Sequence, residues 1–204
     1  MRVKPWDEVY ASPKSVPEML RWGVTHIRLF DELIRHSSVL EVGTGTSMLS
    51  GLASKWCDRV VTLDNSAAVL SSAGAFSARA GTRPHAVRGD AHRLPFPDGV
   101  FSACFSQGLL EHFDDDEVRS MVAEQLRVGS VVYASVPSVF YPHVGPLGPG
   151  LVGNERLLSR GHWLRVLRSP GWDAQGEYYA DFKIASFAGR TVPWPAQILL
   201  RVTR

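Results

Sequence analysis

The stretch that decides the fold is residues 38–64, SVLEVGTGTSMLSGLASKWCDRVVTLD. It begins with a short apolar run, Ser38–Val42, which is followed directly by glycine, and it continues into a helical pattern over Met48–Trp56. A second apolar run, Arg59–Asp64, ends in an acid. A strand, a helix and another strand in this order predict a βαβ unit, whose two strands pair in parallel.

The same alternation continues along the chain and predicts a larger sheet. Helices are expected over Ser66–Ala80, from Asp114 onward and over Ser159–Arg168, and an N-terminal helix begins at the capping pair Ser15 and Glu18. Further strands are expected over His85–Gly89, Phe101–Ser106, Ser130–Val136, Trp172–Asp181 and Ile198–Val202. The pattern therefore predicts an α/β fold: a Rossmann-like doubly wound sheet of seven strands, mostly parallel, with an antiparallel C-terminal edge.

Length and composition restrict the class of protein. The chain has 204 residues, of which 45% are hydrophobic and 21% charged, as expected for one folded domain. The net charge of +2 is small for a nucleic-acid binder, so no nucleic-acid partner is expected. Residues 156–204 hold eight Arg/Lys against three Asp/Glu, which indicates either a site for an anionic partner or a solvated surface.

Other sequence signals argue against metal and membrane binding. The two cysteines, Cys57 and Cys104, fit neither a disulfide framework nor a zinc cluster, and the histidines lack the spacing of metal ligands. The run Asp114–Asp116 is read as a helix cap rather than a metal site. The chain also lacks a secretory signal and an apolar run of about 18 residues. The expected location is therefore the cytoplasm, with no membrane association.

The residues that follow the strands are the candidates for ligand binding, because ligands of open α/β sheets bind beyond the carboxyl ends of the strands. Gly43 and Gly45 follow the first strand and allow a sharp turn and close approach of a ligand. Asp64 ends the second strand, a position from which an acid accepts hydrogen bonds from ribose hydroxyls. Asp90, after the third strand, can reach the far end of the same nucleoside. The alternative for the glycines alone is a tight turn that binds nothing.

The choice of cofactor depends on charge and spacing. A dinucleotide fingerprint requires Gly-x-Gly-x-x-Gly, and the last position here is Met48. Glu41, just before the loop, would oppose a pyrophosphate at the helix N-terminus. S-adenosylmethionine instead carries a sulfonium and an ammonium, which a nearby carboxylate favours. The sequence therefore favours S-adenosylmethionine.

Three segments resemble the class I S-adenosylmethionine-dependent methyltransferases, and especially their small-molecule group. These segments are VLEVGTGTS, VVTLDNS and GDAHRLPFPDGVFSACFSQGLLEHF, within residues 38–136. The first half of the third segment follows the family pattern D-A-x-x-L-P-F-P-D-x-x-F from Asp90 to Phe101. The resemblance implies one methyltransferase domain over 1–204, with an N-terminal arm and helix (1–36), a cofactor-binding core (37–136), and a substrate loop with the C-terminal strands (137–204).

The resemblance also implies roles for single residues. The methionine part of the cofactor would be cradled by Glu41, Gly43, Thr44 and Gly45. Asp64 would bind the ribose, with Asn65 beside the adenine, and Asp90 would accept from the adenine amino group near the Ala91 amide. Ser106 and Gln107 would lie near the methionine ammonium and the transferred methyl. One departure is Ser47, which stands where the family often has a third glycine.

The methyl acceptor is not identified by the sequence, nor is the atom that receives the methyl group. If a general base is needed, the candidates are His112, Tyr141 and His143, and His112 is read mainly as a residue that orients the loop or the cofactor. An acceptor site is expected from Trp6 and Tyr10 of the arm and from the loop 137–153 with Phe140, unless these aromatic residues only pack a lid. The alternative functions are a catalytically silent S-adenosylmethionine-binding or regulatory module and, less favoured, a nucleotide-dependent oxidoreductase.

Overall fold

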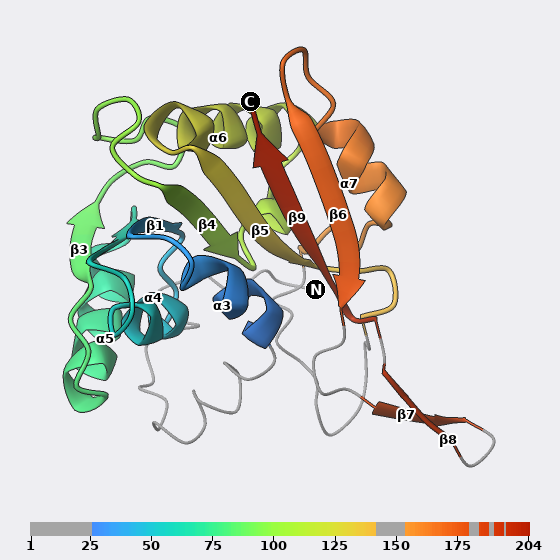
Figure 1. Ribbon diagram of the computed structural model, residues 1–204, viewed down its shortest axis with the longest axis horizontal. Coiled ribbons are helices and arrows are strands. Elements are labelled where there is room, and N and C mark those ends of the chain that lie inside the picture. The colour runs from blue at the N-terminus through green and yellow to red at the C-terminus, as the bar shows by residue number, and fades with distance from the viewer. Residues whose placement is uncertain (1–25, 142–153, 180–183, 188–189, 194) are drawn as a thin grey trace.

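A seven-stranded sheet with helices on both faces forms the body of the protein (Figure 1). The computed structural model describes residues 26–141, 154–179, 184–187, 190–193 and 195–204. Across the sheet the strand order is β3-β2-β1-β4-β5-β9-β6. The strands are β1 (Ser38–Val42), β2 (Arg59–Asp64), β3 (His85–Arg88), β4 (Ala103–Gln107), β5 (Val131–Pro137), β6 (Asp173–Tyr179) and β9 (Gln197–Thr203).

The direction of the strands confirms the predicted mixed sheet. The five strands β1 to β5 pair in parallel, as βαβ connections require. Strand β9 runs antiparallel to both of its neighbours, β5 and β6. The antiparallel strand therefore lies one place in from the C-terminal edge, and β6 forms the edge itself. Strands β7 (Ile184–Phe187) and β8 (Arg190–Pro193) make a separate antiparallel hairpin, which the sequence analysis does not predict and which projects away from the body in Figure 1.

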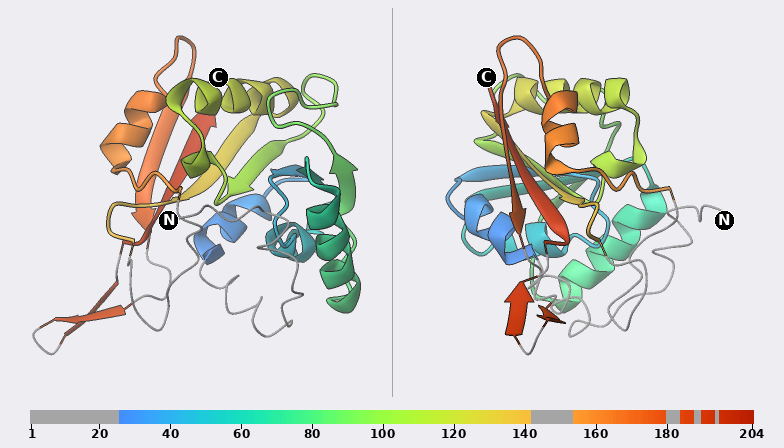
Figure 2. Two further views of the ribbon diagram at one scale, coloured as in Figure 1. Left: turned by 180° about the vertical axis from the view of Figure 1, so that it is seen from behind. Right: turned by 90° about the vertical axis from the view of Figure 1, so that its right-hand side faces the viewer.

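Helices cover each face of the sheet and bury one apolar layer on each side (Figure 2). One layer holds residues of α3 (Ile27–Leu33), α4 (Met48–Ala53) and α5 (Ala67–Arg79). The other holds residues of α6 (Asp115–Val128), α7 (Arg160–Val166) and the 3-10 turn η2 (Leu110–His112). Successive strand residues point to opposite layers: in β5, Tyr133 packs in the first and Val132 in the second. The doubly wound arrangement is thus confirmed.

The predicted elements are present, with shifts at their ends. The helix predicted over 48–56 ends at Ala53, because Lys55 and Trp56 donate to carbonyls only three residues back. The fourth strand starts at Ala103 rather than Phe101, since Phe101 makes only an isolated bridge to Gly129. The capping pair Ser15 and Glu18 lies outside the described residues. None of the described helices is long and apolar enough to cross a membrane.

Candidate functional site

The carboxyl ends of β1, β2, β3 and β4 lie along one edge of the sheet, because these strands are parallel. The loop after β1 is fastened there by Gly43 and Thr44, whose N–H groups donate to the Leu63 carbonyl at 2.9 and 3.2 Å. The N–H of Gly89 donates in turn to the Asp64 carbonyl at 3.0 Å. The structure therefore brings together the segments that the sequence analysis selects after the first three strands.

The loop after β1 needs its glycines. Gly43 has φ +79°, and a Cβ there would lie 3.0 Å from the Leu109 side chain of the loop that follows β4. Gly45 has φ +48° and Ser47 has φ +56°, and both values belong to the left-handed region. Ser47 therefore adopts glycine-like backbone geometry at the position where the resemblance expects glycine, at a cost of roughly 1 kcal/mol or more for a residue with a Cβ.

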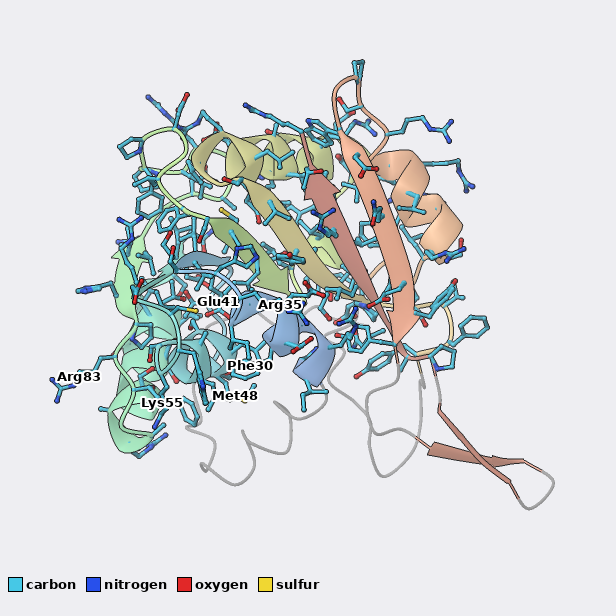
Figure 3. The ribbon with its side chains drawn as sticks, in the orientation of Figure 1. Phe30, Arg35, Glu41, Met48, Lys55 and Arg83 are labelled. Carbon is cyan, nitrogen blue, oxygen red and sulfur yellow. The ribbon has the colours of Figure 1, made fainter. Side chains whose placement is uncertain are left out.

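Glu41 lies inside the molecule, at 3% exposure (Figure 3). Its carboxyl group holds the loop after β1 through hydroxyl groups. Its Oε2 accepts from Ser50 Oγ at 2.6 Å and from Thr62 Oγ1 at 3.1 Å. Ser50 Oγ also contacts Ser47 Oγ at 2.8 Å, and Thr62 Oγ1 contacts Thr44 Oγ1. The carboxyl group is thus the centre of two short chains that reach both sides of the loop.

Burial also changes the charge of Glu41. It raises the pKa of this carboxyl group to about 8, although the hydrogen bonds from Ser50 and Thr62 act in the opposite direction. Burial therefore favours the protonated form of Glu41. The carboxylate expected from the sequence is the form that a nearby cation would favour.

Asp64 is half-buried at the end of β2 and faces the loop after β1. Its Oδ1 accepts from the Ser66 N–H at 2.9 Å. Burial raises the pKa of Asp64, while hydrogen bonds from backbone N–H groups, including those of Gly45 and Thr44, oppose that rise. A carboxyl group set against the glycine loop in this way is suited to accept hydrogen bonds from a ligand lying across the two strand ends.

The other predicted residues, one after β2 and two after β3, are more open to solvent. Asp90 is exposed, and its Oδ1 accepts from the His92 N–H at 2.9 Å, which closes a local turn. Asn65 is exposed, and its carbonyl accepts from Arg88 Nε at 3.0 Å. Ala91 is half-buried and packs against the apolar layer of α6 and α7. These three residues are accessible along the predicted edge.

Two buried polar groups lie at the end of β4. Ser106 is 1% exposed and Glu111 is 3% exposed, and Ser106 Oγ and Glu111 Oε2 make no hydrogen bond to any described residue. Burial raises the pKa of Glu111 to about 8. Gln107, between them, is half-buried. Groups of this kind normally have a partner, so their position points to a ligand or water at this edge. No role for Glu111 is predicted from the sequence.

Of the three predicted candidate bases, His112 and Tyr141 lie within the described residues. His112 Nδ1 lies 2.7 Å from Asn154 Oδ1, and burial lowers the pKa of its imidazole. The side chain therefore ties the end of β4 to the segment before α7, which agrees with an orienting role. Tyr141 is buried, and its N–H donates to the Ser138 carbonyl. Phe140 is exposed, 5.8 Å from the Tyr178 ring. His143, Trp6 and Tyr10 lie outside the described residues.

The acidic run at the start of α6 caps the helix, as predicted. Asp114 Oδ1 accepts from the N–H groups of Asp116 and Glu117 at 3.0 and 2.9 Å, and Glu117 Oε2 accepts from the Asp114 N–H at 3.0 Å. Across the described part of the chain, no three His, Cys, Asp or Glu side chains are grouped to hold a metal ion.

A buried polar cluster at the ends of β5 and β6 is not predicted from the sequence. It joins His26, Ser135 and Tyr179, which come from three separate elements. His26 and Tyr179 are 153 residues apart, so no local motif connects them. This distance in the chain explains why sequence patterns do not reveal the cluster.

Comparison with known proteins agrees with this geometry. Residues 39–129 match the family described as "Methyltransferase domain". No curated protein matches the chain. Among solved structures, the chain resembles magnesium protoporphyrin IX methyltransferase of Synechocystis PCC 6803 with bound S-adenosylhomocysteine, at TM-score 0.60 and 16% identity over 98% of this chain and 93% of that chain.

Two further structures show the range of proteins with this fold. A chain from the complex of the Haloferax volcanii Trm112 methyltransferase activator with a methyltransferase matches at TM-score 0.66 and 17% identity, over 100% of this chain and 98% of that chain. The [4+2]-cyclase SpnF matches at TM-score 0.58 and 21% identity, over 74% of this chain and 58% of that chain. At these identities the structural likeness shows the fold and not the reaction.

The sheet order, the glycine loop and the acid at the end of β2 define a Rossmann-like methyltransferase fold. Together with the family match, they identify residues 39–129 as a class I S-adenosylmethionine-dependent methyltransferase domain.

Proposed function

We propose that this protein transfers the methyl group of S-adenosylmethionine to a small-molecule acceptor by in-line displacement. The observation that carries the proposal is the position of Asp64, whose carboxyl group is set against the N–H groups of the glycine loop. This arrangement supports the binding of a nucleoside across the ends of β1 and β2. We propose that the division into arm, cofactor core and C-terminal part, over 1–204, applies to the whole chain.

The residues present fit the cofactor. Asp64 would bind the ribose hydroxyls, with Asn65, Asp90 and Ala91 toward the adenine. The methionine part would be held by the loop and the end of β4, through Glu41, Gly43, Thr44, Gly45, Ser106 and Gln107. The buried Ser106 hydroxyl, which makes no hydrogen bond to a described residue, supports this choice because a ligand there would satisfy it. When bound, S-adenosylmethionine supplies a methyl group on a sulfonium, which leaves as a neutral thioether.

The protein's own contribution to such a reaction is mainly position and exclusion of water. The network from Glu41 to Ser47 and Thr44 fixes the shape of the loop before any ligand arrives. A cation beside Glu41 would favour its ionised form, so that cofactor binding and ionisation of this group would support each other. Among similar structures, an enzyme that methylates magnesium protoporphyrin IX supports a small-molecule acceptor.

Calorimetry with three ligands tests the cofactor. We expect S-adenosylmethionine and S-adenosylhomocysteine to bind and NADH not to bind. Binding of NADH alone would refute the proposal and favour an oxidoreductase.

Turnover tests the reaction. The protein is incubated with methyl-labelled S-adenosylmethionine and a metabolite extract, and labelled products are separated from the cofactor. We expect a labelled small molecule that depends on the protein. Binding of the cofactor without any labelled product would favour a catalytically silent module.

A further inference from the structure

We propose that Tyr179, supported by His26 and Ser135, accepts the proton of the methyl acceptor, and that the acceptor therefore carries a hydroxyl group. This inference rests on the proposed methyl transfer and specifies the class of its substrate. It starts from the buried cluster of these three side chains.

The three polar groups are close to one another and shielded from solvent. Tyr179 Oη lies 2.9 Å from His26 Nδ1 and 2.5 Å from Ser135 Oγ, whereas Ser135 Oγ lies 3.3 Å from His26 Nδ1. The exposed fractions are 5% for His26, 1% for Ser135 and 9% for Tyr179. The tyrosine oxygen makes both short contacts, so it is the centre of the cluster.

The cluster lies beside the edge of the sheet where the carboxyl ends of β1 to β4 are proposed to bind S-adenosylmethionine. Ser135 pairs with Gln107, the last residue of β4, and its carbonyl accepts from the Gly108 N–H at 3.0 Å. Neighbouring strands lie about 4.8 Å apart, so Ser135 is one strand from Gln107 and about 10 Å from the glycine loop after β1. That distance is suitable for an acceptor beside a sulfur held between these strand ends.

The contacts allow a balanced proton transfer. In the neutral tautomer of His26 that carries its proton on Nε2, Nδ1 can accept from the Tyr179 hydroxyl, and Tyr179 Oη can accept from the Ser135 hydroxyl. As the acceptor oxygen forms its bond to the methyl carbon, the carbon–sulfur bond breaks and its electron pair stays on sulfur. The acceptor proton passes to Tyr179 Oη while the tyrosine proton moves to His26 Nδ1, which leaves an imidazolium. This proton is returned to solvent after the product leaves.

Charged groups of α3 and β6 also lie beside the cluster. Arg28 of α3 and Glu177 of β6 flank His26 and Tyr179 in sequence and pair with each other at 2.7 Å. Arg28 also pairs with Asp31 and Glu32 of α3, at 3.5 and 3.2 Å, so one guanidinium faces three carboxylates at this junction between helix and edge strand. The proposed proton transfer starts from the neutral imidazole of His26.

The fold supplies a matched control. A second histidine–tyrosine pair lies on the same face, beyond the other end of α3: His36 Nε2 is 3.3 Å from Tyr133 Oη. Tyr133 is also buried and also comes from β5. Tyr133 lies two residues further from the carboxyl end of β5 than Ser135 does. Substitutions in this pair remove the same kind of contact without touching the proposed proton path.

The experiment first identifies the labelled product of the wild-type protein and the atom that carries the methyl group. It then compares Tyr179→Phe, His26→Asn and Ser135→Ala with the controls Tyr133→Phe and His36→Asn. For each variant, S-adenosylhomocysteine affinity, thermal unfolding and kcat against pH are measured. We expect an O-methylated product, a kcat at least about 100-fold lower for Tyr179→Phe, and cofactor affinity within twofold of wild type.

The pH profile separates chemistry from structure. The wild-type kcat should fall at low pH as His26 becomes protonated, and His26→Asn should lose this dependence; both controls should keep it. A methyl group on nitrogen, sulfur or carbon would overturn the inference, as would an active Tyr179→Phe or an equal loss in the controls. If Tyr179→Phe does not fold, Ser135→Ala must lower kcat without changing cofactor affinity, or the inference fails. Cofactor binding with no product would refute the proposed function itself, and the inference with it.

Discussion

Asp64 is the single residue whose replacement tests the nucleoside site most directly. Its carboxyl group lies between the turn at Ser66 and the glycine loop. A hydrogen bond to a charged group contributes about 1.5–3 kcal/mol, so Asp64→Ala should weaken S-adenosylmethionine binding by roughly 10- to 150-fold. Calorimetry measures this loss. Asp98→Ala, which removes an exposed partner of Arg127, is the control and should bind as wild type does.

Equal affinity of the Asp64 variant and the control would mean that the ribose is held elsewhere. Because Asp64 also accepts from the Ser66 N–H, Asp64→Asn provides a second comparison that keeps a side-chain acceptor for this turn. Thermal unfolding of both variants distinguishes a loss of contact with the ligand from a loosened turn.

The buried carboxyl groups of Glu41 and Glu111 predict an unusual dependence of stability on pH. Burial raises the pKa of each from an ordinary value of 4.5 to about 8, so the folded protein keeps both protons to higher pH than the unfolded chain does. Their contribution to stability is complete below about pH 4.5 and is lost as the pH rises toward and through 8. Each group can add a slope of up to about 1.4 kcal/mol per pH unit in this window.

Urea unfolding between pH 5 and pH 9 measures this effect. The free energy of unfolding should decrease with pH in the wild-type protein, less steeply in Glu111→Gln, and least in the variant that also carries Glu41→Gln. Glutamine keeps the shape and has no proton to lose in this range. A wild-type slope that both substitutions leave unchanged would contradict the assignment.

Sequence patterns reveal some residues of the candidate site and not others. Gly43, Asp64 and Asp90 are found because each follows a strand, and the topology of parallel strands then brings them to one edge. Glu111 follows the same strand end, but its burial depends on how η2 packs against β5, which no local pattern encodes. His26 and Tyr179 meet only because β6 and β9 complete the sheet, so they become visible only in three dimensions.

At the scale of elements, the capping box of α6 is the clearest local determinant. Asp114 and Glu117 each accept from the backbone N–H of the other. Replacing such a cap by alanine costs about 1 kcal/mol, and asparagine retains the acceptor. We therefore expect Asp114→Ala to lower the free energy of unfolding by about 1 kcal/mol in urea titrations. Asp114→Asn should change it little, and equal effects of the two substitutions would exclude a capping role.

Sequence patterns predict the starts of helices better than their ends, and they do not predict the extra hairpin. The starts of α5 and α7, at Ser66 and Ser159, are predicted correctly, and in the structure a serine side chain caps each helix there. The end of α4 is not, since hydrogen bonds in its last turn decide where the regular helix stops. In sequence, hairpin β7–β8 comes between β6 and β9, which are neighbours in the main sheet. Its separation from that sheet depends on tertiary structure, which the alternation of residues does not encode.

At the scale of the whole molecule, β9 joins the two apolar layers. It lies between β5 and β6, and its neighbouring residues Leu199 and Leu200 point to opposite faces. Leu199 packs with α3 and α4, whereas Leu200 packs with α6 and α7. The last strand of the chain therefore completes both layers and the edge that holds Tyr179.

This position predicts that both layers unfold together. Leu199→Ala and Leu200→Ala each remove a large buried side chain, at 4% and 0% exposure, and each should lower stability by about 2–5 kcal/mol. The free energy of unfolding of a domain is only about 5–15 kcal/mol, so either change should strongly shift a single unfolding transition. Urea unfolding monitored by circular dichroism and by tryptophan fluorescence measures this shift. Gln175→Ala on the exposed edge strand β6 should shift it by less than about 0.5 kcal/mol. Two separate transitions, with only one moved by each leucine variant, would show instead that the layers fold independently and that β9 does not couple them.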